Sequence, residues 1–264
     1  MIVTSQQPAI HTLWVGSALG PLEQLCLASW VRLGYNVVLH CYDELPTPKG
    51  VQTFDAAKSI PRNRIFRNAR NGSLAVFADV YRAMILKRFD ALWLDADIFL
   101  LKAFDFSPPN LLAKEGGDDT KNLNNAVMRL SPDHPILDEI LAIYQHPSRG
   151  LPWDRPGKLW QIFVQSAASL QFGPQHLPWG ALGYIPIQRY VAQHGFDGVI
   201  LESRLCLTGT RTPLFVPVNN PAEALGDPVV YIHFWGSQRK DQLSKPVPSS
   251  IYGLLCRTIG LNVP

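Results

Sequence analysis

Residues 91–101 read ALWLDADIFLL, and this stretch is the clearest guide to the architecture of the chain. Apolar residues run up to Asp95 and resume after Asp97, directly after a helical pattern, which predicts a buried strand of an α/β sheet. Burying two unpaired carboxylates is costly, so we expect both at the carboxyl end of the strand, facing a cleft. Open α/β sheets bind ligands at that edge. Two oxygen ligands converging there suit a divalent cation, Mn²⁺ or Mg²⁺.

The composition is that of a globular protein without a nucleic-acid partner. The chain has 264 residues, of which 47% are hydrophobic, and a net charge of +3. Its four cysteines lie among apolar neighbours without a Cys-x-x-Cys pair, which predicts buried, reduced thiols. It contains no run of 18 apolar residues and no apolar leader pattern, so we expect a cytoplasmic protein. The basic stretch Arg62–Arg70 is more typical of a solvated face, but it permits peripheral contact with the inner face of a membrane.

Hydrophobic periodicity predicts alternating strands and helices. We expect strands over residues 10–16, 37–42, 91–101, 122–130 and 229–235, and helices over 21–33, 74–88, 136–144, 159–170 and 250–259. The opening strand–helix–strand is typical of a parallel sheet with a crossover helix. Residues 43–72 are expected to form a long irregular segment with a short helix near Asp55. Residues 172–228 are expected to form short strands and loops.

Three further features accompany the acidic pair. Asp79 and Arg82 lie three residues apart on the helix before it, and therefore share one face. The first expected strand carries Trp14 near its end. The last carries His233 and Trp235 just before a polar turn.

With these features, several blocks resemble the DXD-containing retaining α-glycosyltransferases. The blocks are IHTLWVG, YNVVLHCYD, FADVYRAMILKRFDALWLDADIFLL, NNAVMRLSPDHPIL and HFWGS. They are similar to the α-1,4-galactosyltransferase and α-1,6-mannosyltransferase grouping and, more distantly, to the glucosyltransferase domains of clostridial toxins. The resemblance covers residues 10–145 and resumes at 229–240. It implies a GT-A type fold: an α/β, Rossmann-like, mixed and mainly parallel sheet flanked by helices. It also implies a nucleotide-sugar donor, a divalent metal and retention at the anomeric carbon.

The resemblance implies catalytic roles for residues matching the family's motifs. Asp95 and Asp97 match the motif aspartates that bind the metal, with Asp95 also reaching the ribose, and His233 matches a late metal ligand. Asp79 and Arg82 match the helix pair that holds the transferred sugar. The simpler alternatives are a surface turn for the acidic pair, a surface ion pair for Asp79 and Arg82, and a structural role for His233.

The same resemblance implies a set of donor-binding residues. Trp14 matches the aromatic that stacks on the nucleobase, although a tryptophan is as often part of the core. Asn125 is expected to face the sugar or the acceptor. Trp235, Ser237 and Lys240, in the turn after the last expected strand, are expected to reach the diphosphate. Besides Asp79, Arg82 and Asp95, the donor-binding set comprises Trp14, Val15, Gly16, Asn125, Trp235, Ser237 and Lys240.

The sequence departs from the family's pattern at one place, which leaves open which subtype of the family it resembles. Family members often carry a Gly-Gly pair before the acidic strand and a Thr or Ser between the aspartates. Here residues 87–90 read KRFD, and Ala96 stands between the aspartates. Both carboxylates remain, so the expectation of metal binding is unaffected.

We therefore expect a metal-dependent hexosyltransferase. It would move a sugar from a UDP-sugar, or a GDP-sugar, to a glycan or lipid-linked glycan hydroxyl with retention, in polysaccharide or lipopolysaccharide biosynthesis. Residues 1–264 would form one domain, with residues 146–228 on the acceptor side. No enzymic nucleophile stands out, so same-face attack assisted by the leaving phosphate is the simpler mechanism; Asp118, Asp119 and Asp154 are the other carboxylates to consider.

Two other functions remain open at this point. A phosphohydrolase of the haloacid-dehalogenase type also ends an apolar strand in Asp-x-Asp, with Asp95 as nucleophile and Asp97 as acid/base. That motif normally opens its domain, whereas here two expected strands precede it, and no later Lys plus paired-Asp pattern is evident. The third possibility is an inactive module that binds nucleotide-sugars.

Overall fold

The computed structural model describes residues 7–116, 122–147, 173–208, 214–220, 225–236 and 246–260, and residues 151, 157, 160, 164, 223 and 243. Its helices are α1 (Pro21–Arg32), α2 (Ala75–Arg88), α3 (Pro135–Gln145), α5 (Tyr184–His194) and α8 (Ile251–Ile259). Its strands are β1 (Ala9–Trp14), β2 (Val37–Cys41), β3 (Val51–Asp55), β4 (Ala91–Leu94), β5 (Ile98–Leu100), β6 (Leu111–Lys114), β7 (Leu123–Arg129), β8 (Val199–Leu201), β9 (Cys206–Thr208) and β10 (Tyr231–His233).

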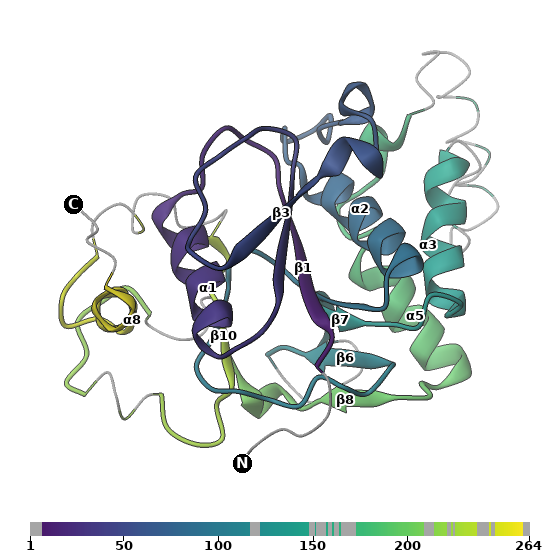
Figure 1. Ribbon diagram of the computed structural model, residues 1–264. Helices are drawn as coiled ribbons and strands as arrows, with labels where there is room; N and C mark the ends of the chain where they lie inside the picture. The colour runs from purple at the N-terminus through teal and green to yellow at the C-terminus, as the bar shows by residue number, and fades with distance from the viewer. Residues whose placement is uncertain are drawn as a thin grey trace.

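Seven of the described strands form the main sheet, in the order β3-β2-β1-β4-β7-β6-β8. Every neighbouring pair is parallel except those of β7, which runs antiparallel to β4 and to β6. Figure 1 shows α1 on one side of this sheet and α2, α3 and α5 on the other. The predicted class, an α/β fold with a mixed, mainly parallel sheet flanked by helices, is confirmed.

Burial on both faces explains why β4 reads as a continuous apolar run. Leu92 and Leu94 belong to the core cluster that contains the buried face of α1. Ala91 and Trp93 belong to the cluster formed with α2 and α3. A strand covered by helices on both faces has no solvated side for polar residues to occupy.

The order of the strands creates a crevice beside β1. Strand β2 pairs with one edge of β1 and β4 with the other, so the sheet grows in opposite directions from β1. The carboxyl ends of strands that flank such a switch point are where open α/β sheets bind ligands. Strand β1 ends at Trp14 and β4 ends at Leu94, so Asp95 enters this crevice directly.

The stretch 91–101 forms two strands, and the prediction of a single strand is wrong. Strand β5 belongs to a second sheet of the described chain, ordered β5-β10-β9. Asp95 and Asp97 lie on the turn between β4 and β5, which the hydrogen bond from Ile98 N to Asp95 O closes at 2.9 Å. The chain therefore leaves the main sheet directly after β4, where the carboxylates of Asp95 and Asp97 need contact with solvent.

Other expectations differ from the structure in detail. Residues 43–72 contain the edge strand β3, which was not predicted because its side chains are half-buried or exposed and show no apolar alternation. The short helix expected near Asp55 is present as a 3₁₀ turn over Ala56–Lys58. Strand β6 and helix α5 were also missed, and α5 lies where only short strands and loops were expected. The helix expected over 159–170 lies mostly outside the described residues.

The cysteines lie in the surroundings that their apolar neighbours predicted. All four cysteines are buried and unpaired, as predicted. Within the described part of the chain, no helix is both long and apolar enough to cross a membrane.

A chain of buried polar side chains links β1, β2 and α2. His11 Nδ1 lies 2.8 Å from His40 Nε2, and His40 Nδ1 lies 2.8 Å from the Tyr81 hydroxyl. Burial lowers the pKa of His11 to about 4. Burial, with the nearby charges of His11 and Arg88, lowers the pKa of His40 to about 3. Both imidazoles are therefore neutral in the folded protein at physiological pH.

This pair makes stability depend on pH. The folded pKa values lie below the 6.5 of an unfolded histidine, so the unfolded chain binds more protons below pH 6.5. The two histidines should lower the free energy of unfolding by roughly 2 kcal/mol per pH unit between pH 6 and pH 4.5, within the limit of about 2.7 kcal/mol for two protons. His40→Gln should remove about half of this slope in urea titrations at pH 7, 6 and 5. The exposed His176→Gln is the control; equal slopes in the wild type and His40→Gln would contradict this prediction.

Candidate active site

A cleft of about 930 Å³ opens at the carboxyl ends of β1 and β4. It is lined by side chains from distant parts of the sequence, including most residues that the sequence nominated. These are Trp14, Val15, Asp79, Arg82, Asp95, Asp97, Asn125, His233 and Trp235. Gly16 is not among the lining residues, and a Cβ there would lie 3.2 Å from Trp14 Nε1. Ser237, Lys240, Asp118, Asp119 and Asp154 lie outside the described residues.

Asp95, Asp97 and His233 converge on one point. One ligand atom from each lies within 4.8 Å of the others. His233 Nε2 is 3.5 Å from Asp97 Oδ1. This proximity follows from the second sheet, because the antiparallel pairing of β10 with β5 places His233 opposite Ile98, the residue after Asp97.

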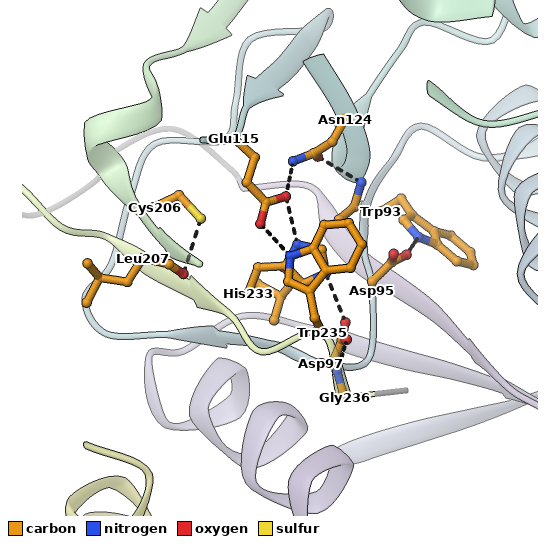
Figure 2. Close-up of polar contacts among 12 residues, drawn as sticks. Trp93, Asp95, Asp97, Glu115, Asn124, Cys206, Leu207, His233, Trp235 and Gly236 are labelled. Carbon is orange, nitrogen blue, oxygen red and sulfur yellow. Dashed lines mark hydrogen bonds and ion pairs between the residues drawn. The ribbon is translucent and has the colours of Figure 1, made fainter. Parts of the chain in front are cut away.

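Glu115 supports this cluster, and it was not identified from the sequence. Its carboxylate lies 2.9 Å from His233 Nδ1, and it accepts hydrogen bonds from Trp235 Nε1 at 2.7 Å and Asn124 Nδ2 at 2.6 Å. Figure 2 shows these three side chains gathered around it. Its only sequence signal is its place directly after the apolar strand β6. A carboxylate on Nδ1 leaves Nε2 of His233 to face Asp97, as in histidines that bind metals.

The charges of this cluster suit a divalent cation. Burial alone would lower the pKa of His233, but Asp97 and Glu115 outweigh it and raise that pKa to about 9. Burial raises the pKa of Asp97, although His233 opposes the shift. Hydrogen bonds and charge from His233 lower the pKa of Glu115 despite its burial. A cation bound here would displace the proton that these carboxylates hold on His233. The two carboxylates and the neutral imidazole then form a donor set that fits Mn²⁺.

Arg82 joins the acidic pair to helix α2. Its guanidinium donates to Asp79 Oδ1 at 3.0 Å and to Asp95 Oδ1 at 2.6 Å, and lies 5.1 Å from the centre of the Trp93 ring. Asn125 Nδ2 donates to Asp79 Oδ1 at 2.7 Å. Because Arg82 is only 3% exposed, the simpler explanation of a surface ion pair is wrong. Burial raises the pKa of Asp79, and Arg82 and Asn125 oppose that shift.

The turn that follows β10, which contains Trp235 and Gly236, contacts Asp97. Trp235 has a positive φ of 55°, and its ring stacks on His233 with centroids 4.8 Å apart. This conformation lets the next residue, Gly236, donate its backbone N–H to Asp97 Oδ2 at 2.9 Å. A Cβ at Gly236 would lie 2.7 Å from Leu22 Cδ2, so a side chain would disturb this contact.

Trp14 lies at the rim of the cleft. The indole N–H donates to Ala18 O at 2.8 Å, which fixes the ring while leaving it half-buried. The ring both packs against the core and lines the cleft, so it is placed to offer a face to a planar ligand.

No protein-family model matches the chain, and no curated protein matches it. Two solved glycosyltransferase structures are similar to it at low identity. The PaToxG glycosyltransferase is 16% identical with a TM-score of 0.39, over 62% of this chain and 71% of that chain. A glycosyltransferase involved in glycosylation of the major capsid of PBCV-1 is 15% identical with a TM-score of 0.42, over 90% of this chain and 100% of that chain. The assignment of function therefore depends on the geometry of the site.

Removing the Glu115 carboxylate should loosen His233. Glu115→Ala should weaken Mn²⁺ binding by about 10- to 100-fold, because the imidazole loses the group that orients it. Glu115→Gln should fall between the wild type and Glu115→Ala, since one amide oxygen still accepts a hydrogen bond. Titration of free Mn²⁺ by electron paramagnetic resonance measures this affinity. Glu202→Gln, at an exposed glutamate, is the control. Unchanged affinity in Glu115→Ala would contradict the role assigned here.

Proposed function

We propose that the protein is a metal-dependent glycosyltransferase of the GT-A type. The observation that carries the proposal is the Asp95–Asp97–His233 cluster, which shares one cleft with the hydrogen-bonded group of Asp79, Arg82 and Asn125. The first set fits a cation that binds a diphosphate. The second offers donors and acceptors suited to sugar hydroxyls.

The donor proposed is a nucleotide-sugar, with a UDP-sugar favoured over a GDP-sugar. A cation held by Asp95, Asp97 and His233 would supply Lewis-acid stabilisation of the departing diphosphate. Arg82 fixes the Asp95 carboxylate through a short charged hydrogen bond, which keeps it aligned with Asp97. Asp79, held by Arg82 and Asn125, orients the transferred sugar. Trp14 stacks on the base at the rim of the cleft.

Retention by same-face attack is the stereochemistry proposed. The carboxylates among the described residues that line the cleft belong to Glu23, Asp79, Asp95 and Asp97. Each accepts hydrogen bonds from the protein itself: Glu23 from backbone N–H groups at the start of α1, and the others from Arg82, Asn125, Trp93 or Gly236. Each carboxylate of this described set is therefore held by contacts within the protein. That supports attack by the acceptor hydroxyl with help from the leaving phosphate.

The geometry favours glycosyl transfer over phosphate hydrolysis. A phosphohydrolase would use Asp95 as its nucleophile, but Asp95 Oδ1 already accepts hydrogen bonds at 2.6 Å from Arg82 and from Trp93. Nor does a lysine line the described part of the cleft. The cleft is also far larger than a phosphate requires and falls within the range typical of sites for small organic ligands. Covalent trapping of phosphate on Asp95 would reverse this preference.

The acceptor proposed is a hydroxyl of a glycan or a lipid-linked glycan, as in polysaccharide or lipopolysaccharide assembly. Residues 146–228 are proposed to form the acceptor side of a single domain. Peripheral contact with a membrane through Arg62–Arg70 stays a prediction.

Asp97 provides the sharpest test of the proposed chemistry. Asp97→Asn should lower Mn²⁺-dependent release of UDP from a UDP-sugar by about 100-fold or more, because the neutral amide is a weak ligand for a hard cation. Asp133→Asn changes an exposed aspartate and is the control. The assay compares UDP-Glc, UDP-Gal, UDP-GlcNAc and GDP-Man with and without Mn²⁺. Full metal-dependent turnover by Asp97→Asn would refute the proposal.

A further inference from the structure

The turn that leads into α5 brings two aromatic rings into the cleft. Trp179 and Tyr184 both line it, with ring centroids 5.2 Å apart and planes tilted by 54°. Trp179 is 50% exposed, one of the most exposed large apolar side chains of the described structure. A large aromatic that lines a cleft but stays open to solvent typically marks a ligand contact.

This exposure is not the result of a loosely held loop. Asn68 Nδ2 donates to Leu177 O at 3.0 Å, and Ala69 N donates to Gln175 O at 2.9 Å, just before the turn. Gly180 has a φ of +81°, and a Cβ there would overlap the Tyr184 ring. The glycine therefore lets Tyr184 fold back against the turn beside Trp179.

The turn also packs directly against the proposed sugar-binding residues. A Cβ at Gly183 would lie 2.7 Å from Asn125 Nδ2 and 2.8 Å from Asp79 Oδ2. The backbone of the turn thus comes close to Asp79 and Asn125, and the aromatic pair is held in a fixed relation to them. The segment that holds the turn in place, residues 67–73, adds Arg67, Asn71 and Ser73 to the lining of the cleft.

We propose that Trp179 and Tyr184 form the platform on which a hexopyranose ring of the acceptor glycan stacks. The inference rests on the proposed function, and it names the residues that bind the second substrate. A pyranose presents C–H groups on one face and hydroxyls around its edge. Its C–H face complements the negative face of an aromatic ring. Two rings tilted by 54° form a corner for that face. Arg67, Asn71 and Ser73 hydrogen-bond to nearby backbone groups and keep further N–H or O–H groups that can donate to the hydroxyls.

The experiment uses the full chain with a divalent cation and nucleotide and has two arms. The first arm measures, in a Mn²⁺-dependent thermal shift, the stabilisation of the protein by UDP and by uridine and guanosine nucleotide-sugars. The second arm measures binding of methyl α-D-glucopyranoside, methyl α-D-galactopyranoside and methyl α-D-mannopyranoside by saturation-transfer NMR in the presence of UDP and Mg²⁺, because paramagnetic Mn²⁺ would broaden the ligand signals. The wild type should bind at least one of them through its ring C–H protons.

The variants separate stacking from a structural effect. Trp179→Ala should weaken binding of that hexoside about tenfold, and Trp179→Phe should recover most of the loss because it keeps an aromatic face. Lys49→Ala is the control, since Lys49 is an exposed, long side chain outside both the described lining of the cleft and the proposed acceptor side. Circular dichroism melts verify that each variant is folded.

Each outcome decides between the proposals. Hexoside binding that is equal in Trp179→Ala and the wild type, or absent from the wild type while UDP stabilises it, would overturn the platform and leave the proposed function standing. Loss of UDP stabilisation in Trp179→Ala would assign the ring to the donor instead and also overturn the platform. A wild type that no uridine or guanosine nucleotide-sugar stabilises with Mn²⁺ would refute the proposed function itself.

Discussion

The carboxylate of Asp95 accepts hydrogen bonds at 2.6 Å from both the Arg82 guanidinium and the Trp93 indole. This contact joins helix α2 to the carboxyl end of β4, and Arg82 carries it on to Asp79 and Asn125. Arg82 is 3% exposed, so removing both of its carboxylate partners would leave a charge almost without solvent. Leaving a buried charge uncompensated in this way typically costs about 3–5 kcal/mol. The position of the acidic turn, and with it the shape of the cleft, depends on this pairing.

The rest of the site is assembled by the two sheets together. The main sheet delivers Trp14 and Asp95 to a switch point at the ends of β1 and β4. In the small sheet, β10 pairs with β5 and sets His233 beside Asp97, although these two residues lie more than 130 positions apart in the sequence. Glu115 then fixes the imidazole and the Trp235 indole together. Figure 2 shows Asp95, Asp97, Glu115, His233 and Trp235 gathered from these separate elements.

The parts that could be predicted from sequence are those with a local pattern. The buried strands β1 and β4 are apolar runs, α1 and α2 have apolar faces, and Asp79 and Arg82 share a helix face by spacing alone. Glu115 has no such pattern, because its role arises from β6 lying beside β7 and near β10 in space. Strand β3 is an edge strand without apolar alternation, and α5 buries only Pro186, Ile187 and Val191, so periodicity gave little signal for either.

Asp95, Asp97 and His233 are proposed to bind one cation, which in turn binds the diphosphate of a nucleotide. Pulsed electron paramagnetic resonance of bound Mn²⁺ detects both contacts. We expect a ¹⁴N coupling from an imidazole that disappears in His233→Ala, and a ³¹P coupling that appears when UDP is added. Mn²⁺ bound without nitrogen coupling, or UDP bound without phosphorus coupling to the metal, would contradict this proposal.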